Sequence, residues 1–492
     1  MRRFLTGLGA LVLLAVLLIA GLYLRILMLP GARPDAVPPY EIALDREGAI
    51  DRLAAALRHE TVSFGTGGEE DRTAFAEFQD FLRASFPLTF DAAEITPIGR
   101  DALLLHFPGT DSTLLPYLLL AHQDVVPAGD ASAWRYPPFS GTLADGYVWG
   151  RGALDDKGAL MATLEAIETL RAEGHAMRRG FYVAFGADEE LGGLEGAARI
   201  AGHFAQQDVR LAFVLDEGLA VLEGIAPGVD APVAMIGIAE KGSLSLRIRA
   251  EAPGGHSSMP PAVSAPGRLA RAIVRLETHQ MPASLDGVAG RMLTRLAPHM
   301  DFPLNLLAGN LWLTGPLVRN RLADVPSSNA LIRTTTAVTM LRGGIKSNVL
   351  APDAEATINF RLRPGDTARE VLDHVRETVD DLGIDVIGDP EEGREASAVS
   401  PDDGPAFDLI AQSIAAVFPR ALIAPGLVVA GTDSRHFEKV ADAVYRFSPY
   451  RLTPGDLPRL HGVDERIGTG DYLDMIRFYA RLITLADGAE KS

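Results

Sequence analysis

Three short apolar segments of the sequence are each followed at once by histidine or carboxylate side chains. The apolar segments cover residues 117–121, 181–185 and 211–215. The groups that follow them are His122-x-Asp124, Asp188-Glu189-Glu190 and Asp216-Glu217. Consecutive carboxylates repel one another unless cations or solvent compensate their charge. Because the chain has no Cys, a metal site built here would use imidazole and carboxylate ligands, which suit zinc and also cobalt or manganese.

A fourth acidic group, Asp155-Asp156, lies in the glycine-rich segment 150–158 (GRGALDDKG). It comes after a hairpin signal at 144–146 (ADG), between two short extended runs. The pair could belong to a metal site, or it could simply cap the helix that the pattern predicts from Lys157 onward. Taken alone, each of the groups that follow the three apolar segments could instead be a polar strand end or a solvated loop.

The length and charge of the chain exclude some classes of protein. At 492 residues the chain is too long for one hydrophobic core and indicates about two to four domains. The net charge of −18, with acidic residues spread along the chain, argues against nucleic acid as a partner. An anionic substrate is still compatible with this charge, because metals or Arg can make one site locally positive.

The N-terminal segment differs from the rest of the chain. Residues 4–24 carry no charge and follow Arg2 and Arg3. A helix of this length would reach ~31 Å, enough to cross the core of a bilayer. We therefore expect a single-pass membrane anchor, with the N-terminus in the cytoplasm and the catalytic body outside it. A cleaved signal peptide, which would leave a secreted protein, is the alternative. Residues 30–41 are expected to form a linker.

The remaining pattern predicts an α/β protein with an insertion. The three apolar segments suit strands buried on both faces of a mostly parallel sheet, and helical patterns such as 157–172 lie between them. After residue 240 the segments 243–250 and 354–362 alternate between apolar and polar residues, as in a sheet with one wet face. We predict a smaller α+β domain at 241–398, inserted between two parts of a catalytic domain, 42–240 and 399–485.

Several segments, spread over residues 45–485, resemble metallopeptidase family 20 and occur in that family's order. They are AHQDVVP (121–127), GRGALDDKG (150–158), ADEELGG (187–193), VLDEG (214–218), PGGHSSMPP (253–261), SNVLAPDAEATINFRLRPGD (347–366), GTDSRHF (431–437) and HGVDERI (461–467). Two more, NLWL (310–313) and ALIRTTTAVTM (330–340), look most similar to the carboxypeptidase S branch, which includes N-fatty-acyl-amino-acid synthases/hydrolases. The resemblance implies a mixed, mostly parallel sheet flanked by helices, of the di-zinc exopeptidase type, with an inserted lid and dimerisation domain.

The resemblance also implies two zinc ions per subunit. His122 and Asp216 would bind one ion, Glu190 and His461 would bind the other, and Asp155 would bridge both. The peptide bond that follows Asp155 is typically cis in the family. His436 also lies near this part of the motif set, but HGVDE matches the family segment better and favours His461.

Two carboxylates next to these ligands would have other roles. The resemblance implies that Asp124 orients His122, and a metal-bound His usually donates its second ring N–H to an acceptor. Glu189 would be the general base and acid, taking a proton from the attacking water and giving it to the leaving nitrogen. Dividing the work between Glu189 and Glu190 keeps the base free of the metal.

Four residues from the second domain or its flank are implied on the substrate side. His256 resembles a His that reaches a neighbouring subunit's site and stabilises the oxyanion, although a turn His is the alternative. Asn348 and Arg361 resemble the pair that holds the substrate's carboxylate, although Arg361 could also be a solvated surface residue. Gly431 resembles part of a loop that borders the substrate.

The resemblance thus implies zinc-dependent hydrolysis of the amide bond of small peptides or N-acyl amino acids with a free carboxylate. A carboxypeptidase S-like enzyme and an N-fatty-acyl-amino-acid hydrolase/synthase would differ only in the acyl pocket. The apolar insert at about 280–335 could shape that pocket or could simply pack. A non-catalytic member is less expected, because no ligand or base is missing from the motifs. The family often dimerises through the second domain, so a homodimer is an expected partner.

Overall fold

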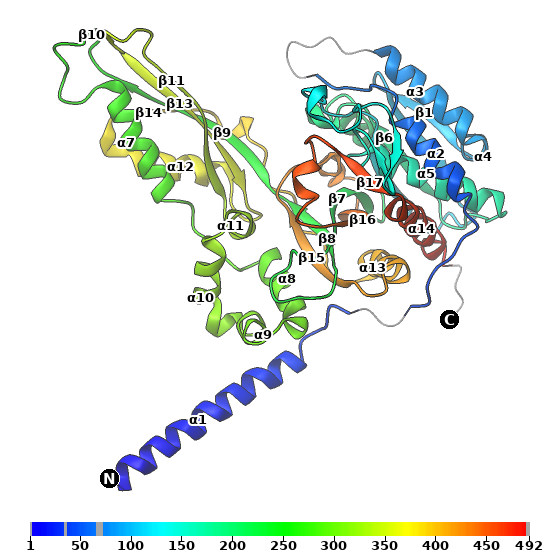
Figure 1. The fold of residues 1–492 in the computed structure, drawn as a ribbon, viewed down its shortest axis with the longest axis horizontal. Coiled ribbons are helices and arrows are strands. Elements are labelled where there is room, and N and C mark those ends of the chain that lie inside the picture. The colour runs from blue at the N-terminus through cyan, green and yellow to red at the C-terminus, as the bar shows by residue number, and fades with distance from the viewer. Residues whose placement is uncertain (1, 34–36, 65–71, 489–492) are drawn as a thin grey trace.

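The computed structural model describes residues 2–33, 37–64 and 72–488. Its larger part is built on an eight-stranded sheet of order β1-β2-β6-β3-β7-β16-β8-β15 (Figure 1). The strands are β1 (Glu94–Ile98), β2 (Ala102–Phe107), β3 (Tyr117–His122), β6 (Phe181–Gly186), β7 (Val214–Leu222), β8 (Val233–Glu240), β15 (Leu422–Val428) and β16 (Val444–Leu452). The central pairs β6–β3, β3–β7 and β7–β16 are parallel, whereas β1, β2 and the β16–β8 contact are antiparallel. The predicted mixed sheet is confirmed.

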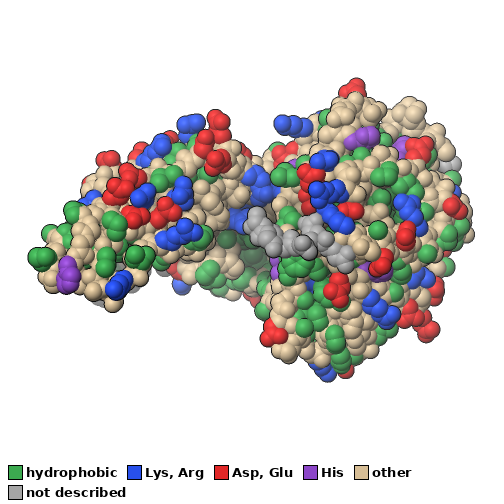
Figure 2. All heavy atoms as spheres, turned by 90° about the horizontal axis from the view of Figure 1, so that it is seen from above, with side chains coloured by type: hydrophobic (Ala, Val, Ile, Leu, Met, Phe, Trp, Pro, Cys, Tyr) green, Lys and Arg blue, Asp and Glu red, His purple; other side chains and the backbone are tan. Residues whose placement is uncertain are grey.

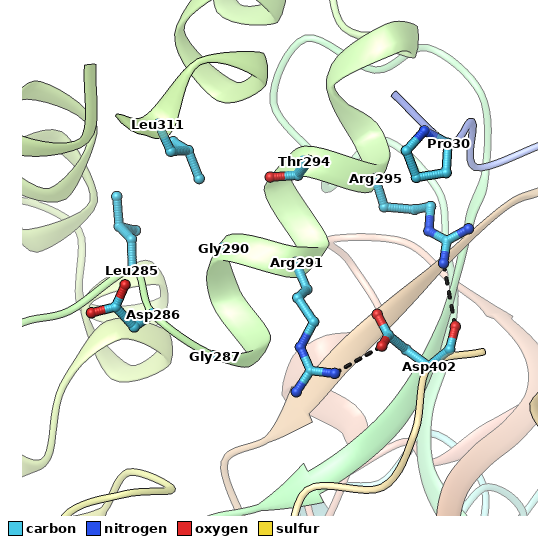
Figure 3. Close-up of a pocket in the computed structure, with 10 residues that line it drawn as sticks. All are labelled: Pro30, Leu285, Asp286, Gly287, Gly290, Arg291, Thr294, Arg295, Leu311 and Asp402. Atoms are coloured by element: carbon cyan, nitrogen blue, oxygen red, sulfur yellow. Dashed lines mark hydrogen bonds and ion pairs between the residues drawn. The ribbon is translucent and has the colours of Figure 1, made fainter. Parts of the chain in front are cut away.

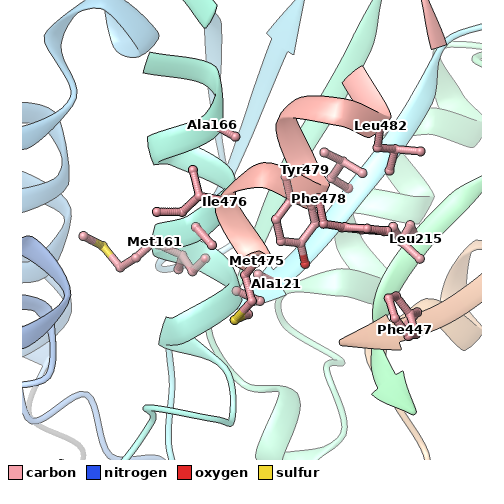
Figure 4. Close-up of a cluster of buried hydrophobic side chains, with 14 of the residues drawn as sticks. Ala121, Met161, Ala166, Leu215, Phe447, Met475, Ile476, Phe478, Tyr479 and Leu482 are labelled. Carbon is pink, nitrogen blue, oxygen red and sulfur yellow. The ribbon is translucent and has the colours of Figure 1, made fainter. Parts of the chain in front are cut away.

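Helices cover both faces of this sheet, because successive side chains of a strand point to opposite sides. Leu103 of β2 belongs to the cluster under α5 and α14, whereas its neighbour Leu104 packs with α6 on the other face. Figure 4 shows Ile476 of α14 in the first cluster on the side of α5, and Phe478 on the side of Leu215 and Phe447 of the sheet. The helices of this part are α2 (Arg46–Ala56), α3 (Arg72–Ser85), α4 (Pro87–Ala92), α5 (Lys157–Ala172), α6 (Ala197–Gln206), α13 (Pro405–Val417) and α14 (Thr469–Ala486).

A small three-stranded sheet brings together segments that are far apart in the chain. Its order is β17-β5-β4, with β4 (Thr142–Ala144), β5 (Tyr147–Trp149) and β17 (Arg466–Gly468). The predicted hairpin joins β4 to β5 through Asp145 and Gly146, whose φ angles of 55° and 79° suit a tight turn. Because β17 pairs with β5, the segment before residue 466 is held next to the glycine-rich turn at 150–156.

The insertion has a sheet and an apolar core of its own. Its strands run in the order β11-β13-β9-β14, with β9 (Gly242–Glu251), β11 (Thr335–Gly343), β13 (Asp353–Leu362) and β14 (Ile384–Ile387). The predicted alternation is confirmed, since Leu244, Leu246, Ile358 and Phe360 are buried under α7 (Ala265–Thr278) and α12 (Ala368–Val379). The short pair β10 (Gly255–His256) and β12 (Val349–Leu350) forms the outer tip (Figure 1).

Four further helices precede β11: α8 (Val288–Leu296), α9 (Leu304–Gly309), α10 (Leu311–Ala323) and α11 (Pro326–Ile332). In Figure 1, α8, α9 and α10 lie below the two sheets, on the side of α1. Asp402 ties α8 to the segment before α13, through Arg291 at 2.8 Å and through its carbonyl oxygen to Arg295 at 3.3 Å (Figure 3). Part of this apolar insert packs inward, as Leu307 does, whereas Phe302 and Trp312 are exposed.

The N-terminal helix α1 (Arg2–Leu27) points away from the rest of the molecule and contacts α9 near its end (Figure 1). In the part of the chain that the structure describes, no helix meets the length and hydropathy needed to cross a membrane. The predicted membrane span over residues 4–24 is therefore not supported, and the alternative of a secreted protein stays a prediction. The predicted linker includes residues 34–36, which lie outside the described residues. Ala32, at its start, is buried against β15.

Candidate metal centre

The site lies where neighbouring parallel strands end. His122 is the last residue of β3 and pairs in register with Gly186, the last residue of β6. The turn Glu189–Leu191 follows β6 directly, and Asp216 and Glu217 lie in β7 on the other side of β3. Because these strands are parallel, their carboxyl ends share one edge of the sheet, where ligands of α/β proteins gather.

The His122 ring is buried and has its two nitrogens in different roles. Nδ1 donates to the backbone oxygen of Asp124 at 2.9 Å, which leaves Nε2 as the free acceptor in the neutral ring. Nε2 lies 2.9 Å from Asp155 Oδ1 and 3.6 Å from Glu217 Oε1. Burial disfavours the charged ring, but the carboxylates of Asp124, Asp155 and Glu217 raise its pKa well above the ordinary value. The surroundings thus favour a positive charge at this nitrogen.

Asp155 lies between two imidazole rings. Its Oδ1 faces Nε2 of His122 and its Oδ2 faces Nε2 of His461, each at 2.9 Å. His461 also lies 3.4 Å from Glu190 Oε2. The hydrogen bond to Asp155, and then the one to Glu190, raises the pKa of His461 to about 10. One carboxylate with a ring at each oxygen is the arrangement that a bridge between two cations requires.

Two sets of ligand atoms lie close enough together to hold an ion. His122, Asp155 and Glu190 form one set, and His122, Asp156 and Glu217 form the other, with atoms within 4.8 Å of each other in each set. Both carboxylate oxygens of Asp156 and Oε1 of Glu190 are buried and lack a hydrogen-bond partner among the described residues. Buried polar atoms normally have partners, so these oxygens fit a site built for cations. The Asp155–Asp156 bond is cis.

The structure does not place Asp216 in either of these sets, whereas the next residue, Glu217, belongs to one of them. The role of Asp216 as a metal ligand stays a prediction from the sequence. Consecutive residues of an extended strand point to opposite sides, and only one of the two can face His122. The carboxylate of Asp216 accepts hydrogen bonds from the backbone N–H of Ser434 at 2.8 Å and of Glu217 at 3.0 Å. Burial, followed by the charge of Asp155, raises the pKa of Glu217 to about 8. The adjacent acid of the same motif was the signal for Glu217.

Asp124 holds more than the His122 ring. Its carboxylate lies 3.4 Å from Nδ1 of His122, which is farther than its own backbone oxygen. The same carboxylate accepts hydrogen bonds from the hydroxyl of Ser63 at 2.8 Å and from the backbone N–H groups of Glu189 and Glu190 at 3.2 Å each. Asp124 therefore fixes the turn that presents the two glutamates, as well as the ring.

Glu189 lies beside the cluster but outside both sets of ligand atoms. Burial, together with the negative charges of Glu217, Asp433 and Asp155, raises its pKa well above the ordinary value, and the charge of His122 opposes this. A carboxylate that readily takes up a proton next to the site suits a general base. His436, the other candidate ring, lies 3.1 Å from the backbone oxygen of Gly192 and does not reach Asp155.

A buried ion pair joins the two chain segments that carry the centre. Arg151 Nη1 lies 2.6 Å from Glu465 Oε2, and its Nη2 donates to the backbone oxygens of His461 and Gly462. Glu465 Oε1 accepts from the N–H groups of Leu154 at 2.8 Å and Asp155 at 3.2 Å. The pair therefore fixes the Asp155 turn against the His461 loop. Neither residue was predicted from the sequence to belong to the site.

Two predicted substrate residues lie far from this cluster within one chain. His256 is exposed in β10 at the outer tip, with Nδ1 2.8 Å from Ser258 Oγ. Asn348 is exposed beside it, where its backbone oxygen accepts from the N–H of Ser257. Arg361 lies near the opposite end of β13, roughly 30 Å away at ~3.3 Å per residue. Asn348 and Arg361 therefore do not lie side by side within one chain, and their role as a pair on the substrate carboxylate stays a prediction.

Gly431 and Arg361 lie where the insertion meets the part built on the large sheet. Gly431 follows β15 and begins the loop whose Ser434 holds Asp216. A methyl group at Gly431 would lie 2.5 Å from Nη2 of Arg394, so a larger residue there would have to displace that guanidinium. Arg361 is exposed on the open face of its sheet, opposite Ser243 of β9.

The chain is similar over most of its length to proteins of known family. The model of "Peptidase family M20/M25/M40" matches residues 118–485. An N-fatty-acyl-amino acid synthase/hydrolase PM20D1 of Xenopus tropicalis is 42% identical over 483 residues, covering 97% of this chain and 94% of the relative. A probable carboxypeptidase S-like 2 of Dictyostelium discoideum is 37% identical over 455 residues, covering 92% and 87%.

Solved structures share the fold at low sequence identity. A metallo-carboxypeptidase Sso-CP2 of the M20 family from Sulfolobus solfataricus has a TM-score of 0.66 at 17% identity, covering 89% of this chain and 99% of that one. Human carnosine dipeptidase 1 has a TM-score of 0.63 at 15% identity, covering 90% and 96%. At these identities the likeness concerns the fold alone.

Proposed function

Since the chain belongs to peptidase family M20, we propose that it hydrolyses the amide bond of N-acyl amino acids or small peptides with a free carboxylate, using two zinc ions. The family is one of metal-dependent peptidases and amidohydrolases, and the chain is an enzyme of that group. The observation that carries the proposal is the Asp155 carboxylate, with His122 at one oxygen and His461 at the other.

The donor set fits two divalent ions. His122 and Glu217 would hold one ion, His461 and Glu190 the other, and Asp155 would bridge them. Imidazole and carboxylate ligands without thiolates suit zinc, with cobalt or manganese as alternatives. Such ions supply Lewis acidity and lower the pKa of bound water towards neutrality. The orphaned oxygens of Glu190 and Asp156 support this occupancy.

The protein's own contribution to the reaction rests on Glu189. Its raised pKa lets it take a proton from the attacking water and keep it on the carboxylate. It then gives that proton to the amide nitrogen that leaves. Glu190, one residue away, has an oxygen 3.4 Å from His461 and would remain a ligand. Asp124 keeps both residues in place through their backbone N–H groups.

We further propose that residues 241–398 act as a lid and dimerisation domain. His256 and Asn348 are exposed together at its tip and have no described partner from the metal centre. In a symmetric dimer the same tip of each copy can reach the other copy's site. His256 would then donate to the oxyanion of the second subunit, and Asn348 would contact substrate there.

The acyl group is proposed to be a long chain, because the PM20D1 relatives carry that activity in their names. A cavity of ≈ 340 Å³ at the junction of the insertion and the large sheet offers room for an apolar part of the substrate. Its apolar lining includes Val288, Leu331, Val399 and Leu427. A carboxypeptidase that acts on small peptides is the second candidate, favoured by the carboxypeptidase S-like relatives.

Turnover profiling of the purified full chain tests these alternatives. Zinc-loaded protein is assayed against long-chain N-acyl amino acids and against dipeptides, with release of the free amino acid as the readout. The acyl proposal expects higher kcat/KM for the long-chain substrates. Equal or faster turnover of dipeptides would favour the carboxypeptidase instead. No turnover of either class by zinc-loaded protein would overturn the proposed function.

A further inference from the structure

Two arginine side chains stand on the same open face of the insertion's sheet. Arg361 of β13 is paired in register with Ser243 of β9. On its other side Ser243 forms a bridge with Arg394, in which each N–H donates to the other's carbonyl oxygen at 2.7 Å. Residues opposite one another on adjacent strands point to the same face. Arg361, Ser243 and Arg394 therefore form one row, with the two arginines roughly 10 Å apart at their Cα atoms.

This row lies at the edge of the proposed active site. The guanidinium of Arg394 packs against Gly431, the first residue of the loop whose Ser434 holds Asp216. The negative charge of Glu189 also acts on Arg394. Arg394 thus connects the open face of the insertion to the general base of the same subunit, whereas His256 and Asn348 lie at the far tip.

Neither guanidinium has an ion-pair partner within the described parts of the chain. No carboxylate there forms a salt bridge with Arg361 or Arg394, and Nε of Arg394 is buried without a hydrogen bond. The neighbouring cations make hydrogen bonds to neutral groups: Lys241 donates to the carbonyl oxygens of Ala330 and Arg333, and Arg435 to those of Thr432 and Gly192. Carboxylates act on this region from farther away, Glu240 and Glu189 on Arg394 and Asp366 on Lys241. Figure 2 shows lysine and arginine side chains at the waist between the two lobes.

Burial and the positive charges in this region lower the pKa of Arg394 and of Lys241. Burial, and then the positive charges of Arg435 and Arg361, lower the pKa of Arg394. Burial, and then the charge of Arg361, lower the pKa of Lys241 to about 8. A half-buried cation without a counter-ion is unfavourable, and the binding of an anion relieves that penalty.

We propose that Arg394 is a further substrate-binding residue, which holds the free carboxylate of the substrate together with Arg361 of the same subunit. This inference rests on the proposed function and deepens it. The planar fork of Arg suits a carboxylate bound through two oxygens, which a lysine would not reproduce. A substrate carboxylate bound by Arg361 and Arg394 would neutralise positive charge between the insertion and the large sheet. It would also place the adjoining amide towards Glu189.

The test compares substrates with and without the carboxylate. Wild type, Arg394→Gln and Arg394→Lys are assayed with an N-acyl amino acid and with its carboxamide, which lacks the negative charge. We expect Arg394→Gln to raise KM for the carboxylate substrate about tenfold or more, and to leave the carboxamide unchanged. Arg394→Lys should recover part of the loss. An equal loss on both substrates, or no loss, would overturn the inference.

Arg247→Gln is the matched control, because Arg247 is on the same sheet face but is paired with Glu355 nearer the tip. It should change neither substrate's KM. If the carboxamide turns over too slowly, binding of both compounds to Glu189→Gln and to the Glu189→Gln/Arg394→Gln double variant gives the same comparison by calorimetry. Absence of turnover in the wild type would count against the proposed function, whereas a missing carboxylate dependence in active variants would count against Arg394 alone.

Discussion

The carboxylate of Glu217 lies 3.6 Å from Nε2 of His122, on the ring nitrogen that also faces Asp155. Asp216, the preceding residue, turns its carboxylate to the backbone N–H of Ser434. Two adjacent acids of one strand therefore have different tasks: Glu217 faces the proposed ions, and Asp216 anchors the loop that begins at Gly431. This distinction leads to the first prediction.

Glu217→Gln should lower the zinc content of the protein from two ions towards one per subunit. The amide is a poorer ligand than the carboxylate, and the loss of one ion should reduce kcat by at least about 100-fold. Metal analysis of the dialysed protein and turnover of an N-acyl amino acid measure both effects.

Asp216→Asn is the matched control for this change. It removes the same charge one residue away, but the amide oxygen can still accept from Ser434. We expect both ions to remain. If Asp216→Asn lost zinc and Glu217→Gln kept it, Asp216 would be the ligand after all.

Glu189→Gln should abolish turnover without releasing metal. The amide cannot accept a proton from water, and general base catalysis contributes roughly 10²–10⁴-fold. Zinc content and the affinity for an unreactive substrate analogue should stay close to wild type. Turnover within tenfold of the wild type would contradict the assignment of Glu189 as the base.

Mixing two inactive variants tests whether His256 acts across a dimer. His256→Ala leaves Glu189 intact, and Glu189→Gln leaves His256 intact, so a hybrid dimer has one complete site. After subunit exchange at equal concentrations, about a quarter of the wild-type activity should return. Differently tagged subunits, purified as hybrids, verify the exchange. Inactive hybrids would mean that His256 does not serve a neighbouring site.

Zinc binding to metal-free protein should release protons near pH 7. The pKa of His461 is raised to about 10 and that of Glu217 to about 8, so both groups hold a proton at neutral pH without metal. Zinc requires the deprotonated ligands, and its affinity should therefore rise as the pH rises towards these values. Calorimetry in buffers of different ionisation enthalpy measures the release. Binding heats that do not depend on the buffer would contradict it.

Glu465→Gln should loosen the connection between the Asp155 turn and the His461 loop. It leaves the buried guanidinium of Arg151 without its counter-charge, which costs about 3–5 kcal/mol in comparable cases. We expect a lower midpoint of thermal unfolding and weaker zinc binding. Asp442→Asn, which breaks the half-exposed pair with Arg210, should cost under about 1 kcal/mol. Similar effects of the two variants would show that the buried pair has no special role.

Local patterns predicted much of the architecture. The apolar segment 117–121 of β3 indicated a strand covered on both faces, and the alternation around Leu246 and Ile358 indicated a sheet with one open face. The pattern placed His122 and Glu190 directly after such strands, and the resemblance to the family supplied their roles as ligands. These features depend on burial and strand geometry, which neighbouring residues determine.

Other features depend on contacts that a local pattern does not contain. Asp216 and Glu217 both suit a metal, and only the direction of each side chain separates them. The distance between Asn348 and Arg361 follows from one strand that runs through both ends of the insertion. Arg394 reaches the site through a single bridge to Ser243, formed by a segment with no strand pattern of its own.

The centre draws His122 from the first quarter of the chain and His461 from close to its end. During synthesis on the ribosome, the second imidazole emerges only after the whole insertion has been translated. The nascent polypeptide therefore lacks one of the five proposed ligands until translation is almost finished. Binding of both ions should therefore require the full-length chain, and truncated translation products that lack His461 should be inactive.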